Sequence, residues 1–285
     1  MPPTLRAPTP ADAPTLGRIA YEAFKAIAER HAFPPDFPGP DVATHLIGSL
    51  VASPATHGVV AEADGRVVGS NFIHVGGPIA GVGPITVEPT AQNAGVGRRL
   101  MQAVVDWAAT QPVVGVRLVQ AGYHMRSLSL YASLGFDVRE PLVCVQGTPL
   151  RRALPDRAVR AATPADADAC NALCEAVHGH HRAGEVREAI RHGTATVGEH
   201  DGRGTGYATS VAFFGHAVGE TTDDVAALIA AAPTFPGPGF LLPSRNTELL
   251  RWCLAHGLRS IQPMTLMSRG WYQEPRGAFL PSITF

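Results

Sequence analysis

Between residues 57 and 146, the pattern of hydrophobic and polar positions predicts three strands first and further helices and strands after them. Residues 57–62 and 66–75 alternate as two strands, and the Asp64-Gly65 pair between them is typical of a hairpin turn. An apolar run over residues 80–87 predicts a third strand. These segments together predict an antiparallel meander near the start of the fold.

Helical periodicity begins further along the chain. Apolar residues recur three and four positions apart over residues 96–109 and again over 127–134, which predicts two helices. The apolar run 114–120 is typical of a central strand, and residues 136–146 predict the last strand. The order predicts an α/β (α+β) protein with a mixed, largely antiparallel central sheet flanked by helices.

A phrase from the start of the chain returns near its middle. Residues 5–13 and 159–167 are identical at seven of nine positions, and in both a short strand meets a Thr-Pro-Ala-Asp helix start. Threonine suits a helix cap, proline the first helical position, and aspartate the positive end of the helix dipole. The spacing predicts two related halves.

A second repeat supports this interpretation. Residues 130–136 (LYASLGF) correspond to 252–258 (WCLAHGL), at an offset of 122 residues instead of the 154 that separates the first pair, so the second half is 32 residues shorter in its middle. Prolines and arginines interrupt the hydrophobic pattern between 147 and 156. We therefore expect a fold present twice, with domains at 1–147 and 158–285.

Composition and charge narrow the class of protein. With 23 basic and 24 acidic residues the net charge is −1, so we expect neither nucleic acid nor an anionic membrane as partner. The basic residues are 22 arginines and one lysine, which is typical of a GC-rich bacterial genome. No apolar run reaches the length of a membrane span and the first residues do not resemble a signal peptide. Four scattered cysteines are typical of reduced, buried thiols, so we expect a cytoplasmic protein, monomeric or homodimeric.

The segment from Val87 to Leu100 carries the clearest chemical signal. A strand ends, a turn begins at Pro89, and Gly95-Val96-Gly97 opens a helix. Backbone N–H groups at a helix start have no intrahelical partner and lie at the positive end of the dipole, while glycine lets a ligand approach closely. This pattern predicts an anion site, most plausibly for a pyrophosphate.

Two other phosphate motifs fit poorly. A P-loop needs Gly-Lys followed by Ser or Thr, and here Arg98 and Arg99 follow Gly97. A dinucleotide fingerprint needs a third glycine in an early βαβ unit, and position 100 is leucine.

The segment Gln92-Asn93-Ala94-Gly95-Val96-Gly97 resembles the Arg/Gln-X-X-Gly-X-Gly/Ala motif of the GNAT superfamily of N-acetyltransferases. Residues 130–136 resemble the second motif of that family at the expected distance. The resemblance covers residues 3–146, and the internal repeat predicts that 158–270 is a degenerate second half. It implies a GNAT fold and acetyl-coenzyme A (acetyl-CoA) as co-substrate.

The resemblance also implies roles for single residues. The pyrophosphate would be held by the backbone of residues 92–97 with Arg98, and the strand Ile85-Thr86-Val87 would pair with the pantetheine arm. Tyr131 would be the general acid that protonates the leaving thiolate, and a core tyrosine is the structural alternative. The full set of expected cofactor-binding residues is Ile85, Thr86, Val87, Gln92, Asn93, Ala94, Gly95, Val96, Gly97 and Arg98.

The general base has no clear candidate. The family often carries a glutamate on the strand before the phosphate loop, but residues 80–87 contain no acid. Glu88, His74 and His124 are candidates, and His124 stands where many family members have asparagine. The strand-like tail 280–285 raises the further possibility that the terminal carboxylate reaches the site.

The second half lacks the glycine loop. A strand is expected over 209–214 and a helix over 222–232, and Cys253 corresponds to Tyr131. We expect no coenzyme A there, and a role in completing the acceptor pocket or stabilising a shared core. Cys174 and His178 are spaced for a helix face, but the spacing matches no standard zinc site, so no metal is expected.

The sequence therefore predicts transfer of an acetyl group from acetyl-CoA to the amine of a small molecule, by direct attack on the thioester. Two alternatives remain open. One is a non-catalytic acyl-CoA-binding or regulatory module, against which Tyr131 argues. The other is transfer of a longer acyl group, which would differ only in the volume of the pocket.

Overall fold

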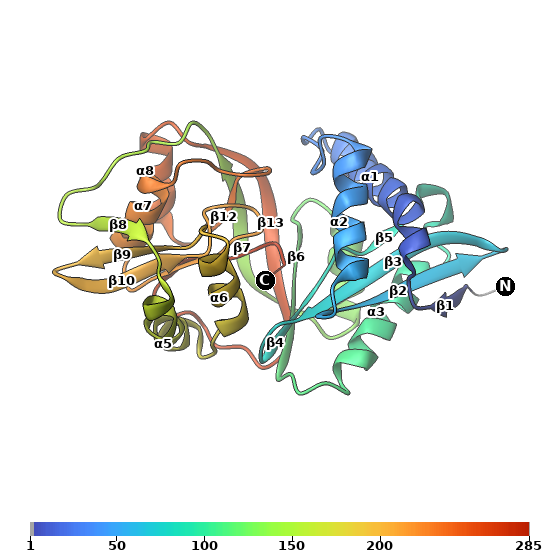
Figure 1. The fold of residues 1–285 in the computed structure, drawn as a ribbon. Helices are drawn as coiled ribbons and strands as arrows, with labels where there is room; N and C mark the ends of the chain where they lie inside the picture. The colour runs from blue at the N-terminus through green and yellow to red at the C-terminus, as the bar shows by residue number, and fades with distance from the viewer. Residues whose placement is uncertain (1–2, 285) are drawn as a thin grey trace.

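The computed structural model describes residues 3–284, and these form two lobes that meet along central strands (Figure 1). The first half contains β1 (Thr4–Arg6), α1 (Ala13–Arg30), α2 (Pro40–Ala52), β2 (Thr56–Ala63), β3 (Arg66–Val75), β4 (Ile79–Val82), β5 (Thr86–Val87), α3 (Val96–Ala108), β6 (Gly115–Ala121), α4 (Met125–Ser133) and β7 (Asp137–Gln146). The second half contains β8 (Ala158–Ala161), α5 (Ala167–His178), α6 (Ala183–Arg191), β9 (Thr196–His200), β10 (Arg203–Ala208), β11 (Ala217–Gly219), α7 (Thr222–Ala231), β12 (Phe240–Pro243), α8 (Thr247–Ala255), β13 (Arg259–Gly270) and β14 (Ala278–Leu280).

Most elements of the expected fold are confirmed. The hairpin β2–β3 turns at Asp64 and Gly65, both with positive φ, and α3, β6, α4 and β7 lie within two residues of their predicted bounds. The sheets are largely antiparallel, with β4 and β6 as the parallel pair, and helices cover them. The fold class predicted from the hydrophobic pattern is therefore correct.

Three local predictions are wrong or incomplete. The expected strand 80–87 is two short strands that both pair with β3, because Pro84 offers no N–H to a ladder and interrupts the strand between β4 and β5. Residues 209–214 are an irregular loop instead of a strand. Val211 and Phe213 are buried in two separate cores, and Phe214 is exposed. Helix α2 was not predicted, although Pro40 at its start is a recognisable signal.

The strands form two sheets, and the larger one contains strands from both halves. It runs β1-β2-β3-β4-β6-β13-β7-β12, with β5 paired to β3, and the smaller one runs β14-β11-β10-β9-β8. Strand β13 lies between β6 and β7, and β7 lies between β13 and β12. The expected boundary at 147–158 therefore divides the sequence but does not divide the larger sheet (Figure 1).

The repeated phrase makes the same contacts twice. Arg6 forms a bidentate pair with Asp12, at 2.7 and 2.8 Å, and reaches Glu62 at 2.7 Å. Arg160 does the same with Asp166, at 2.7 and 2.8 Å, and reaches Glu199 at 2.8 Å. In both places the arginine ties the first strand of the half to the start of its first helix.

Helix α8 begins and ends 122 residues after α4, as the second repeat predicts. The four cysteines are all buried and unbridged, as expected. Within residues 3–284, none of the helices is long and apolar enough to cross a membrane.

Candidate active site

The start of α3 has no side-chain cap. Gly95 is the N-cap residue and adopts φ +79°, a left-handed conformation that disfavours other residues. No side chain caps this helix, so the amides of its first turn keep their hydrogen-bonding capacity for a ligand. Val96 and Leu100 bury on the opposite side and fix the helix to the sheet. The arrangement favours a phosphate at the helix start.

Arg126 holds the loop before this helix. Its guanidinium donates hydrogen bonds to the side-chain oxygens of Gln92 and of Asn93, the second at 3.0 Å. Gln92 in turn donates from Nε2 to the carbonyl of Val87 at 3.1 Å. The role of Arg126 could not be predicted from the sequence, because its partners lie more than thirty positions away. Arg98 is exposed beside the loop and donates to the hydroxyl of Ser133 at 2.6 Å.

The sheet opens next to this loop. Strands β4 and β6 pair from Ile79 to Gly81, and beyond that point β5 pairs with β3 while β6 stays paired with β13 on its other side. A cavity of about 780 Å³ fills the opening. Both predicted catalytic residues, Tyr131 and His124, line it. So do nine of the predicted cofactor-binding residues, namely Ile85, Thr86, Val87, Gln92, Asn93, Gly95, Val96, Gly97 and Arg98. Ala94 is exposed and does not line the cavity.

Tyr131 reaches the cavity from α4. The residue is 6% exposed and belongs to the core formed by β6 and α3. Burial raises the pKa of its phenol to about 12, and a hydrogen bond with the Ser127 hydroxyl opposes that rise. A phenol of high pKa stays protonated at neutral pH, so it is available as a proton donor.

His124 lies at the N-terminus of α4. Its Nδ1 accepts the backbone N–H of Ser127 at 3.4 Å, so the ring caps the helix. Burial and the neighbouring Arg126 lower its pKa to about 4. The ring is therefore neutral at pH 7, with one nitrogen turned toward the helix.

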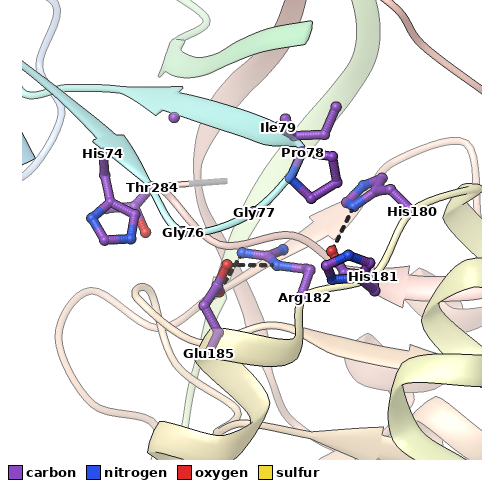
Figure 2. A pocket seen from close by; sticks show the side chains of 11 residues that line it. His74, Gly76, Gly77, Pro78, Ile79, His180, His181, Arg182, Glu185 and Thr284 are labelled. Carbon is purple, nitrogen blue, oxygen red and sulfur yellow. Dashed lines mark hydrogen bonds and ion pairs between the residues drawn. The ribbon is translucent and has the colours of Figure 1, made fainter. Parts of the chain in front are cut away.

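The other two base candidates lie outside the large cavity. Glu88 makes an ion pair with Arg18 at 3.4 Å. His74 lies at a small cavity of about 20 Å³ between the lobes, opposite His180, His181 and an Arg182–Glu185 pair (Figure 2). The structure therefore does not bring His74 or Glu88 to the place where Tyr131 lies.

The second half supplies part of the cavity wall, which is one of the two roles expected for it, although the sequence did not identify the residues. They come from the loops after β10 and before β12, from β13 and from the tail, namely Phe213, Phe214, Gly237, Pro238, Met264, Ile283 and Thr284. The terminal carboxylate belongs to Phe285, which lies outside the described residues. Asp36, in the loop between α1 and α2, also lines the cavity and was not found from the sequence.

The suspected metal pair gains no support. Cys174 and His178 are both buried in α5, and no cluster of three or more metal-ligating side chains occurs in residues 3–284.

Comparisons with known proteins agree with this geometry. The model of the "Acetyltransferase (GNAT) family" matches residues 22–136. The chain is 30% identical over 105 residues to the IAA acetyltransferase of Azospirillum brasilense, covering 36% of this chain and 69% of that protein. It is 33% identical over 82 residues to the mycothiol acetyltransferase of Tsukamurella paurometabola, but spans only 28% of each protein.

Two solved structures share the whole arrangement. A proposed acetyltransferase from Pyrococcus horikoshii superposes with a TM-score of 0.74, covering 98% of this chain and 94% of its own at 16% identity. A GCN5-related N-acetyltransferase from Sphaerobacter thermophilus gives 0.61, covering 95% and 96% at 16% identity. At that identity the likeness shows the fold, including the two-lobed architecture. The match to the family model, together with the Azospirillum brasilense relative of which this chain covers 69%, shows that the chain belongs to the GNAT acetyltransferase family.

Proposed function

We propose that the protein transfers the acetyl group of acetyl-CoA to the amine of a small molecule, by direct attack on the thioester. The observation that carries this proposal is the single cavity that joins an uncapped helix N-terminus to a buried tyrosine. The first feature suits a pyrophosphate and the second suits a leaving thiolate.

The residues present fit acetyl-CoA. The α3 amides with Arg98 would hold the pyrophosphate, and the free edge of residues 85–87 along the opening would pair with the pantetheine arm. When bound, acetyl-CoA supplies an acyl group activated as a thioester. Tyr131 then has one task, which is to give its proton to the departing sulfur.

We also propose one such site per chain. In the second half, the helix corresponding to α3 is α7, and its N-terminus is capped by Thr221 and Asp224. Strand β14 adds to the edge of β11 and contacts β12, so the opening between those strands is filled by the chain itself. The second half would serve as a wall of the acceptor pocket.

Turnover tests the proposal. Acetyl-CoA and a panel of primary amines should give free coenzyme A and the N-acetylated amine, detected by thiol titration and mass spectrometry. Binding of acetyl-CoA without product from any amine would favour the non-catalytic module. Faster turnover with butyryl-CoA than with acetyl-CoA would favour transfer of a longer acyl group.

A further inference from the structure

Asp36 is a carboxylate inside the large cavity that none of the motifs explains. It lies in the loop between α1 and α2, half-buried, and its Oδ1 accepts a hydrogen bond from Nε2 of Gln262 at 3.0 Å. Gln262 is buried on β13, a strand contributed by the second half. The two halves thus meet at this carboxylate.

Asp36 approaches the sheet from the face opposite to Tyr131. On β13, Met267 belongs to the core that contains Tyr131, whereas Met264 and Leu266 belong to a second core with Phe213. Gln262, Met264 and Leu266 are two positions apart along β13, and such residues point to the same face of a sheet, whereas successive residues point to opposite faces. The cavity is lined by both Asp36 and Tyr131 because it passes through the opening between β4 and β6.

The wall around Asp36 is mostly apolar. Phe24 and Phe37 meet edge to face at 5.5 Å between ring centroids, and Leu46, Phe214 and Met264 continue this wall. Within residues 3–284, Asp36 forms no salt bridge with an arginine, lysine or histidine. A carboxylate so placed has a cost of desolvation that a bound cation offsets.

The titratable groups near Asp36 come from several elements. Tyr123 follows β6 and Cys144 lies on β7, and the charge of Asp36 raises the pKa of both groups, in each case after a larger effect of burial. Arg30, His45, His124 and Arg126 line other parts of the same cavity. Burial raises the pKa of Asp36 itself, and the Gln262 hydrogen bond opposes that rise. A carboxylate with a raised pKa is a better base than an exposed one.

We propose that Asp36 binds the ammonium group of the acceptor and takes one proton from it, and that the acceptor is a primary amine on a compact apolar or aromatic body. This inference rests on the proposed function. The neutral nitrogen forms a bond to the thioester carbon, the carbon–sulfur bond breaks, and the sulfur takes a proton from Tyr131. The second nitrogen proton restores the Tyr131 phenol through water, and the proton on Asp36 leaves to solvent, so atoms and charge balance.

The test uses Asp36→Asn, which keeps the shape and the oxygen that faces Gln262. The probe is 2-phenylethylamine with acetyl-CoA, and the control is Asp41→Asn, an exposed carboxylate at the start of α2. We expect kcat/KM to fall by about 10²- to 10⁴-fold at pH 7 in Asp36→Asn, the usual contribution of a positioned base, and to stay unchanged in the control. The loss should shrink with aniline, which is already neutral at pH 7. Equal loss with both amines, or no loss, would overturn the proposal.

Gln262→Met gives a second readout that does not depend on the asparagine variant folding. It removes the hydrogen bond that holds the pKa of Asp36 down. The acidic limb of the kcat/KM profile should therefore move to higher pH, while the Kd of coenzyme A stays within twofold. An unmoved limb would contradict the role of Asp36 as base.

Binding separates this inference from the proposed function. If the wild-type protein acetylates no amine, the proposed function fails, and Asp36 is then judged by calorimetry on the coenzyme A complex. Stronger binding of 2-phenylethylamine than of 2-phenylethanol, lost in Asp36→Asn, would support a carboxylate that recognises ammonium. No preference for the amine would overturn the inference.

Discussion

Helices α3 and α7 occupy corresponding places in the two halves, but their N-termini are completed in opposite ways. At α3 the cap is Gly95, with no side chain, and the first-turn amides face a large cavity. At α7 the cap is Thr221, whose N–H and hydroxyl both bond to Asp224, at 2.9 and 2.6 Å. Asp224 also accepts from Thr205 at 2.6 Å and is 2% exposed. The second helix start already holds an anion, and that anion is its own side chain.

The gap between neighbouring strands beside each helix also differs between the two halves. Between β4 and β6 the opening is a cavity, whereas between β11 and β12 it contains β14. By contrast, the Arg6–Asp12–Glu62 contacts of the first half recur as Arg160–Asp166–Glu199 in the second. The comparison indicates that the contacts which build the fold are present twice, while the features suited to a cofactor are present once.

The largest effect is expected from Gly95→Asp. The side chain would place a negative charge among the α3 amides and at a position with φ +79°, so coenzyme A binding should fall by more than 100-fold. Gly257→Asp is the matched control, because Gly257 has φ +80° with open space around it but lies at the end of α8. Isothermal calorimetry measures both variants. Normal binding by Gly95→Asp would remove the phosphate site from α3.

Tyr131→Phe should have the next largest effect. The change removes one hydroxyl and keeps the ring, so kcat and kcat/KM should fall together by roughly 10²- to 10⁴-fold, with little change in the Kd of coenzyme A. Cys253→Ala alters the corresponding position of α8 and should leave kcat unchanged. A melting curve comes first, since an unfolded variant would give the same loss. Full activity in a folded Tyr131→Phe would assign the proton to another donor.

Stoichiometry tests the comparison itself. One coenzyme A should bind per chain, because Asp224 and β14 fill the second half. Calorimetry with protein of known active concentration gives this number directly. A value near two would show that the second half binds as well.

The sequence predicted the fold and the glycine loop at the start of α3 because both depend on neighbours along the chain. Periodicity located α3, β6 and α4, and Gly95 marked the helix start through a local motif. The pairing of β7 with β13, one strand from each half, joins segments more than a hundred residues apart, which no local pattern records. The same holds for Arg126 on Gln92, for the Phe213 wall and for Asp36 on Gln262.

Residue 124 shows how a local signal can be interpreted in two ways. His124 departs from the asparagine expected before Tyr131, yet Asn246 stands at the corresponding position of the second half and caps α8 through Leu249 N–H at 3.0 Å. His124 caps α4 through Ser127 in the same manner. The comparison gives this side chain a structural role at a helix start, and its catalytic role stays a prediction.

The smallest effect is expected where the two halves agree. Asp12→Ala and Asp166→Ala remove the same contacts, to an arginine and to the Thr9 or Thr163 N–H at 2.6 and 2.7 Å, so each should destabilise the protein by about 1–2 kcal/mol. Arginine holds the pKa of both carboxyls well below the usual range. A carboxyl whose folded pKa is depressed contributes stability above its unfolded pKa, near 4, and loses it as the pH falls further. The difference between wild type and variant should therefore be constant from pH 7 to about pH 5 and shrink below about pH 4 in urea unfolding. A large loss of unfolding free energy in one variant and none in the other would show that the repeated contacts do not stabilise the two halves equally.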